Sequence, residues 1–120
     1  MSRVIVAGGR DFKDYKLLEK TLNKHLPKRN VTIVQGEAKG ADALGKRYAV
    51  ENSIGVDSFP ADWDRYGKAA GHRRNAEMAA YAKNKPRGML IAFWDGKSRG
   101  TSNMINTAIR YKLKILIIFY

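Results

Sequence analysis

Short apolar runs alternate with amphipathic stretches along the whole chain. The apolar runs predict strands, and stretches with apolar residues at helical spacing predict helices between them. The predicted strands are Val4–Ala7, Val31–Gln35, Gly55–Phe59, Met89–Trp94 and Ile115–Phe119, and the predicted helices cover about Tyr15–Leu26, Ala41–Asn52, Gly71–Ala82 and Thr101–Tyr111. Strands that are apolar on both faces and separated by helices are typical of a parallel sheet covered on both sides. The pattern therefore predicts one α/β domain over residues 1–120, with three layers and about five mostly parallel strands flanked by helices.

The composition excludes several classes of protein. The 44% apolar share excludes a disordered chain, and the lack of a long uncharged run excludes a membrane span. The absence of cysteine excludes disulfides and thiolate metal sites. The chain begins Met1-Ser2-Arg3 and runs straight into a strand pattern, which leaves no room for a signal peptide. We therefore expect a cytoplasmic protein (in the host cytoplasm if the source is viral) with no membrane partner.

A strong positive charge fits two interpretations. Lys and Arg total 23 against 11 Asp and Glu, a formal net charge of +12. Counterion release makes such a surplus attractive to polyanions, so nucleic acid is one candidate partner. Alternatively, the surplus is a solvated face, because Lys16, Lys20 and Lys24 fall on one side of the first predicted helix. The four loops that follow strands hold 8 basic and 6 acidic residues, a mixture that suits a ligand with both phosphates and hydroxyl groups.

Ligands bind beyond the carboxyl ends of the strands in open parallel sheets, so the loops after the predicted strands are the places to search. The first begins with the pair Gly8-Gly9, which permits a tight turn close to a ligand. The second, residues 36–42, is a glycine-rich turn into a helix N-terminus, where free N–H groups attract anions. Strand two ends in Gln35 instead of an acidic residue, so the NAD-binding fingerprint fails. Asp42 either caps that helix or matches the positive charge of its N-terminus, or it belongs to the site.

The third loop is long and aromatic. Trp63 and Tyr66 offer flat faces for stacking a base, or they pack as a small satellite core under the loop. Beyond them, Arg73 or Arg74 could clamp a phosphate with two hydrogen bonds. The chain has only two histidines, so a histidine metal cluster is excluded.

The fourth loop, residues 95–101, matches the nucleophile-elbow pattern G-x-S-x-G of serine hydrolases. That chemistry needs a histidine later in the chain, and none follows Ser98. A second phosphate cradle, in which Gly100 and Thr101 open a helix, accounts for the same residues.

Taken in order, the loop motifs resemble the YspA/YpsA-related branch of the SLOG superfamily. They are Gly8-Gly9-Arg10-Asp11-Phe12, Gly36-x-x-x-Gly40-Ala41-Asp42, Pro60-Ala61-Asp62-Trp63, Gly71-x-x-Arg74-Asn75 and Asp95-Gly96-x-Ser98-x-Gly100-Thr101. Members of that superfamily have a Rossmann-like α/β fold and bind nucleotide-derived ligands at these loops. Its relatives include cytokinin-activating phosphoribohydrolases and the DNA-processing protein A, and some SLOG domains act as sensors in bacterial and phage conflict systems.

The resemblance implies a sensor or sequestering module for ADP-ribose, a nucleoside phosphate or a nucleotide signal. A nucleotide-like ligand is thus expected, while the sequence identifies no metal-binding residues and no certain cofactor. The residues expected to bind it are Gly8, Gly9, Arg10, Asp11, Gly36, Lys39, Gly40, Asp42, Asp62, Trp63, Arg74, Asn75, Asp95, Gly96, Ser98, Gly100 and Thr101.

Two other functions stay open, a nucleotide-processing hydrolase and a DNA-binding protein resembling DNA-processing protein A. The phosphoribohydrolases carry a catalytic glutamate in the motif Gly-Gly-x-Gly-Thr-x-x-Glu, and Met104 stands at that position here. Glu37, Asp42 and Asp62 are the remaining candidates for a general acid or base. Finally, the apolar C-terminal strand would need cover at a sheet edge, so we expect a homo-oligomer.

Overall fold

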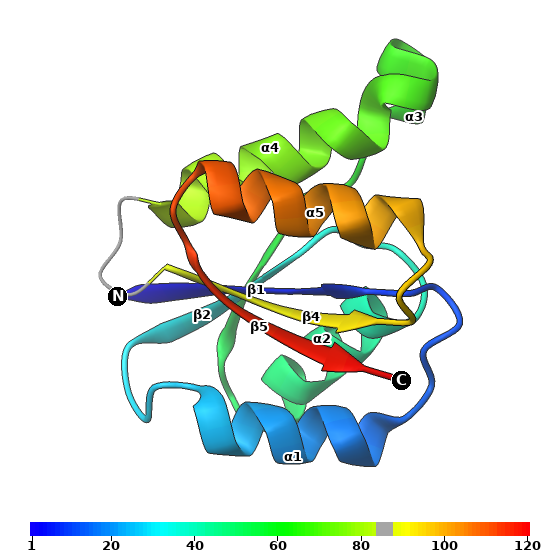
Figure 1. Ribbon diagram of the computed structural model, residues 1–120. Helices are drawn as coiled ribbons and strands as arrows, with labels where there is room; N and C mark the ends of the chain where they lie inside the picture. The colour runs from blue at the N-terminus through cyan, green and yellow to red at the C-terminus, as the bar shows by residue number, and fades with distance from the viewer. Residues whose placement is uncertain (84–87) are drawn as a thin grey trace.

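The computed structural model describes residues 1–83 and 88–120 (Figure 1). Its strands are β1 (Ser2–Gly8), β2 (Val31–Gln35), β3 (Gly55–Ser58), β4 (Met89–Trp94) and β5 (Lys114–Phe119). Its helices are α1 (Tyr15–His25), α2 (Ala41–Glu51), α3 (Trp63–Tyr66), the 3-10 turn η1 (Gly67–Ala69), α4 (Ala70–Lys83) and α5 (Arg99–Arg110). The strands form one sheet in the order β3-β2-β1-β4-β5, and every neighbouring pair is parallel.

The sheet separates two layers of helices, with α1 and α2 on one face and α4 and α5 on the other (Figure 1). Successive side chains of a strand point to opposite faces, so the apolar run of β1 supplies both cores. Val4 and Val6 pack with α1 and α2, while Ile5 and Ala7 pack with α4 and α5. This arrangement confirms the predicted three-layer, Rossmann-like α/β fold.

The order in which the chain adds strands reverses at β1, in the centre of the sheet. From β1 it moves outward through β2 to β3, and then crosses to β4 on the other side of β1. The loops that leave β1 and β4 therefore diverge to opposite faces, which opens a crevice at the carboxyl ends of these strands. In the register of the sheet, Gly8 lies opposite Phe93 at that end.

The structure differs from the sequence prediction mainly after β3. The stretch expected to be a long loop contains α3 and η1, which lead directly into α4. Asp62 caps α3, since its carboxylate accepts a hydrogen bond from the backbone N–H of Arg65 at 3.1 Å. The expectation of strands apolar on both faces is wrong for β3, an edge strand whose residues are partly or fully exposed. Among the described helices, none is long and apolar enough to cross a membrane.

Candidate functional site

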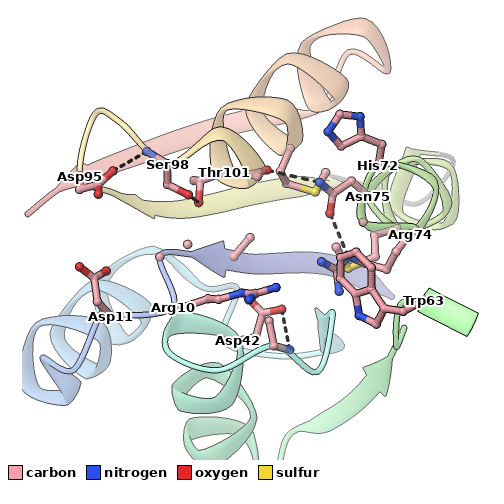
Figure 2. Close-up of a pocket in the computed structure, with 18 of the residues that line it drawn as sticks. Arg10, Asp11, Asp42, Trp63, His72, Arg74, Asn75, Asp95, Ser98 and Thr101 are labelled. Atoms are coloured by element: carbon pink, nitrogen blue, oxygen red, sulfur yellow. Dashed lines mark hydrogen bonds between the residues drawn. The ribbon is translucent and has the colours of Figure 1, made fainter. Parts of the chain in front are cut away.

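A cleft of about 480 Å³ lies at the carboxyl ends of β1 and β4, where the crevice was expected (Figure 2). It is built from all four loops singled out in the sequence and from the start of α4. The lining residues are Ala7, Gly8, Gly9, Arg10, Asp11, Ala38, Asp42, Trp63, Lys68, Gly71, His72, Arg74, Asn75, Met78, Asp95, Ser98, Gly100, Thr101 and Met104. Twelve of the seventeen residues expected to bind ligand thus come together around one space.

The two glycines after β1 allow three segments to meet beneath the cleft. A Cβ atom on Gly8 would stand 2.3 Å from the carbonyl oxygen of Phe93, so only glycine fits there. Gly9 donates its N–H to the same oxygen at 3.1 Å, and its own carbonyl accepts from the N–H of Ala41 at 3.2 Å. These contacts fix the β1–α1 loop against both β4 and the start of α2.

Arg10 and Asp11 follow the glycines and face the cleft differently. Arg10 is exposed, and its guanidinium has no hydrogen-bond or ion-pair partner within the described part of the chain. Asp11 accepts a hydrogen bond from the hydroxyl of Tyr120 at 2.6 Å, and burial together with this bond raises the pKa of that tyrosine. Arg10 is therefore available to an anionic ligand, while Asp11 also anchors the chain after β5.

Asp42 is a buried carboxylate in the first turn of α2. It accepts hydrogen bonds from the N–H groups of Gly36 at 2.9 Å and Ala38 at 3.4 Å, and so it shapes the β2–α2 loop. The expected capping role is not observed, because the residue at the N-cap of α2 is Gly40, whose φ of +79° favours glycine. Burial raises the pKa of Asp42 to about 6, although the nearby Arg74 opposes that shift.

Arg74 and Asn75, at the start of α4, join three of the loops. Arg74 donates to the carbonyl of Gly36 through Nη1 and to Oδ1 of Asn75 at 3.0 Å through Nε. The buried amide of Asn75 donates to Oδ1 of Asn103 at 2.9 Å and to the carbonyl of Gly100 at 3.4 Å. Arg74, expected as a phosphate clamp, therefore also holds the β2–α2 loop in place, and burial lowers its pKa.

The opposite wall is the N-terminus of α5 (Figure 2). Oδ1 of Asp95 accepts from the N–H groups of Lys97 and Ser98, both at 2.8 Å, and these bonds lower the pKa of Asp95. Ser98 occupies the N-cap, but its hydroxyl lies 3.3 Å from that of Thr101 and does not cap the helix. The first N–H groups of a helix have no partner within the helix, so this wall presents donors to an anion.

The rim of the cleft carries an aromatic and two basic side chains. Trp63 is 51% exposed, so it is not the satellite core considered from the sequence. Lys68 and His72 line the same side and are exposed. Tyr66, the other aromatic of this segment, lies outside the cleft lining, with the guanidinium of Arg73 4.0 Å from its ring centre.

Five of the expected ligand residues do not line the cleft. Gly36 and Lys39 border a smaller hollow beside it. Gly40 and Gly96 have positive φ angles and form turns, and Asp62 caps α3. Gly40, Gly96 and Asp62 thus serve the local structure of their segments, which explains why residues of such types stand there.

Of the three carboxylates considered as catalysts, Asp42 is the one that lines the cleft. Glu37 points into the smaller hollow and forms an ion pair with Lys46 at 2.9 Å. Hydrogen bonds with Ser58, Lys46 and Gln35 lower the pKa of Glu37 to about 2. Glu37 is thus ionised and paired, which is a poor state for a general acid.

Seven residues that line the cleft were not among those expected from the sequence, and four of them belong to α4 and α5. The missed lining residues are Ala7, Ala38, Lys68, Gly71, His72, Met78 and Met104. Helical spacing carried a signal for several of them. Gly71, Asn75 and Met78 are four and three residues apart and share one face of α4, and Met104 lies one turn after Thr101.

Comparison with known proteins gives two matches. A family model described as "YspA, cpYpsA-related SLOG family" matches residues 2–66, slightly more than half of the chain. The chain is also 30% identical to "Gene 61 protein" of Mycobacterium phage D29, over 97% of this chain and 95% of the phage protein. The family match covers the β1–α1, β2–α2 and β3–α3 loops, and so includes Arg10, Asp42 and Trp63 of the cleft.

Proposed function

Since the chain belongs to the YspA, cpYpsA-related SLOG family, we propose that it binds a phosphorylated, nucleotide-derived ligand in the cleft between β1 and β4. The ligand is ADP-ribose, a nucleoside phosphate or a nucleotide signal, and the protein acts as a sensor or sequestering module. Such a ligand is a cytoplasmic metabolite, so we place the function in the cytoplasm, that of the host if the source is viral.

The observation that carries this proposal is the pairing of an unpartnered arginine with a helix N-terminus across one cleft. Arg10 lies on one wall and the first turn of α5 on the other (Figure 2). Both attract phosphate, the first by charge and the second by its N–H groups. Asp95 can accept hydrogen bonds from ribose hydroxyls, and the exposed ring of Trp63 can stack on a base.

Binding without turnover is favoured by the residue that stands where the related phosphoribohydrolases carry their catalytic glutamate. Met104 is buried and lines the cleft, so an apolar thioether occupies the place of a carboxylate. The second candidate, a nucleotide-processing hydrolase, is supported by Asp42 alone, a buried carboxylate of raised pKa in the cleft. In that case Asp42 would act as the general acid or base.

The net charge supports an interaction with nucleic acid at a surface outside the cleft, weaker than the proposed binding of the nucleotide ligand. Inside the cleft three basic residues, Arg10, Lys68 and Arg74, face three aspartates, so the charge surplus lies elsewhere. Exposed lysines of α1 are part of that surplus. A DNA-binding function would use this outer surface and would weaken steeply with salt.

We also propose that the protein forms homo-oligomers. β5 lies at one edge of the sheet, where its outer backbone groups have no neighbouring strand within residues 1–83 and 88–120. Phe119 on this strand is 64% exposed. A second copy would cover both the open edge and this apolar side chain.

A thermal-shift screen tests the proposed function. The panel contains AMP, ADP, ADP-ribose, NAD, cyclic and linear oligonucleotides and a single-stranded DNA. A ligand at about 100 times its Kd adds roughly 2.7 kcal/mol to the free energy of unfolding, which is visible as a shift in Tm. We expect a nucleotide derivative to shift the wild type, and incubation of that ligand with the protein to leave it intact.

The variant Arg10→Ala should lose most of this shift without losing stability, because the guanidinium of Arg10 has no hydrogen-bond or ion-pair partner among the described residues. The matched control is Arg29→Ala, an exposed arginine in the α1–β2 loop at the opposite ends of the strands. A ligand that Arg10→Ala binds as well as the wild type would contradict the site. Turnover abolished by Asp42→Asn would establish the hydrolase, and a shift with DNA alone, erased by salt, would establish the DNA-binding function.

A further inference from the structure

A second hollow of about 280 Å³ lies directly beside the main cleft. The two spaces share four lining residues, Arg10, Ala38, Trp63 and Arg74. The second hollow lies between the β2–α2 loop and the segment before α3, where Pro60 and Ala61 line it. The binding region is therefore longer than the main cleft, and it has two compartments.

The boundary between the compartments is cationic. Arg10 and Arg74 both line it. Burial lowers the pKa of Arg74 and the nearby carboxylate of Asp42 raises it, while Arg10 is close enough for its positive charge to lower that pKa further. Figure 2 shows the side chain of Arg10 extending across the cleft toward Arg74 and Trp63. Two neighbouring guanidinium groups repel each other unless an anion lies between them or over them. An anionic group of a ligand fits this boundary better than either end compartment.

The two compartments differ in chemistry. The main cleft carries the carboxylates of Asp11, Asp42 and Asp95, which can accept hydrogen bonds from sugar hydroxyls. In the second hollow the one carboxylate, Glu37, is already paired with Lys46. The second hollow also holds Lys39, which is exposed and has no partner among the described residues. It is the smaller space and suits a second, smaller polar group.

From this geometry we propose that the ligand has two end groups joined by a phosphate or diphosphate linker. The nucleoside lies in the main cleft, the linker crosses Arg10 and Arg74, and the second end group enters the hollow beside Lys39. This inference rests on the proposed function and narrows its ligand from nucleotides in general to linker-containing, dinucleotide-like molecules. A mononucleotide fills the first compartment and leaves the second open.

Calorimetric titration with AMP, ADP and ADP-ribose separates the compartments. ADP carries the diphosphate without a second end group, so the difference between ADP and ADP-ribose reports on the second hollow. We expect ADP-ribose to bind the wild type about tenfold more tightly than ADP. Ala61→Leu, which narrows the second hollow, and Lys39→Ala, which removes its free cation, should abolish most of that difference while the affinity for AMP stays unchanged.

The control is Lys28→Ala, an exposed lysine in the α1–β2 loop far from both compartments, which should retain the full preference for ADP-ribose. An ADP-ribose affinity equal to that of ADP, or a preference that survives in both hollow variants, would overturn the two-compartment ligand. In those cases AMP and ADP still bind and the proposed function stands. Absence of binding for all three nucleotides would overturn the two-compartment ligand, and the thermal-shift panel with NAD and the oligonucleotides would then decide the proposed function separately.

Discussion

Asp42 is a carboxylate in the site whose titration makes the free energy of unfolding fall as pH rises, the opposite of the usual effect of an aspartate. Its pKa rises from 3.8 to about 6 because it is buried. Between these two values the folded protein binds more protons than the unfolded chain, so this residue makes the free energy of unfolding fall as pH rises. Above pH 6 the folded protein holds a buried carboxylate that would be more stable in water.

The variant Asp42→Asn removes that charge and keeps an oxygen that can accept from Gly36 and Ala38. We expect it to lose the fall in stability between pH 4 and 6, and at pH 7 to be more stable than the wild type by roughly 1–3 kcal/mol. Urea unfolding of both proteins at pH 4, 5, 6 and 7 measures this difference.

Glu37→Gln serves as the control, because Glu37 affects the pH dependence of the free energy of unfolding in the opposite direction. The pKa of Glu37 is lowered, so its contribution is present above the pKa of the unfolded chain and is lost as pH falls below it. The two variants should therefore diverge from the wild type in different pH ranges. Parallel pH curves for Asp42→Asn and the wild type would show that Asp42 does not titrate as the burial of its carboxylate requires.

At the scale of elements, the N-terminus of α5 owes its openness to Gly100. This residue lines the cleft, and a Cβ atom there would meet no other atom within 4 Å. Gly100→Ala should therefore fold normally and gain up to about 1 kcal/mol, because alanine is the better helix former. The added methyl group enters the space next to the N–H donors, so we expect ligand affinity to fall about tenfold. Chemical denaturation and calorimetry measure the two effects separately.

Gly8→Ala is the contrasting variant. Its Cβ atom would stand 2.3 Å from the backbone carbonyl oxygen of Phe93 and 2.8 Å from the Cβ of Ala41. The backbone of β4 would have to shift to relieve this clash, at a large cost in free energy. This substitution should destabilise the fold itself. A Gly100→Ala protein that binds ligand as well as the wild type would mean that the ligand does not approach the first turn of α5.

The elements that the sequence predicts well are those whose burial depends on repeated apolar positions. The residues of β4, from Met89 to Phe93, are buried on both faces, and a continuous apolar run is enough to indicate such a strand. The helix α3 was missed because four residues cannot show a periodicity. It depends on the Asp62 cap, and an aspartate with that role looks like a ligand-binding aspartate in the sequence.

In the candidate site, too, some features could be predicted from the sequence and others could not. Loops after β1 and β4 flank the crevice at the reversal of strand order, so their residues could be assigned to one cleft from topology alone. Which way a side chain in a loop points could not be predicted. Glu37 has a positive φ of 60° and turns toward Lys46, whereas Asp42, five residues later, turns into the cleft. These directions follow from backbone geometry and ion pairs that no sequence motif records.

At the scale of the whole molecule, the sheet edge formed by β5 is where we expect a partner. Among the residues that the structure describes, β5 has β4 on one side and no strand on the other. Its residues from Ile115 to Ile118 are only partly buried, although they pack against both cores. Phe119 is 64% exposed, with its ring 5.7 Å from that of Trp94. A bare apolar edge of this kind favours association, and we expect the wild type to be a homodimer in solution.

The variant Phe119→Lys places a charge on this edge and removes little that is buried. We expect it to be monomeric by light scattering at concentrations where the wild type is dimeric, with a Tm lower by only a few degrees because a dimer is also stabilised by association. Val50→Lys is the matched control, since Val50 is 70% exposed on α2 and lies on another face. The control should remain dimeric. A wild type that is monomeric at every concentration, or a Phe119→Lys protein that still dimerises, would show that β5 is protected by its own flanking side chains and not by a second copy.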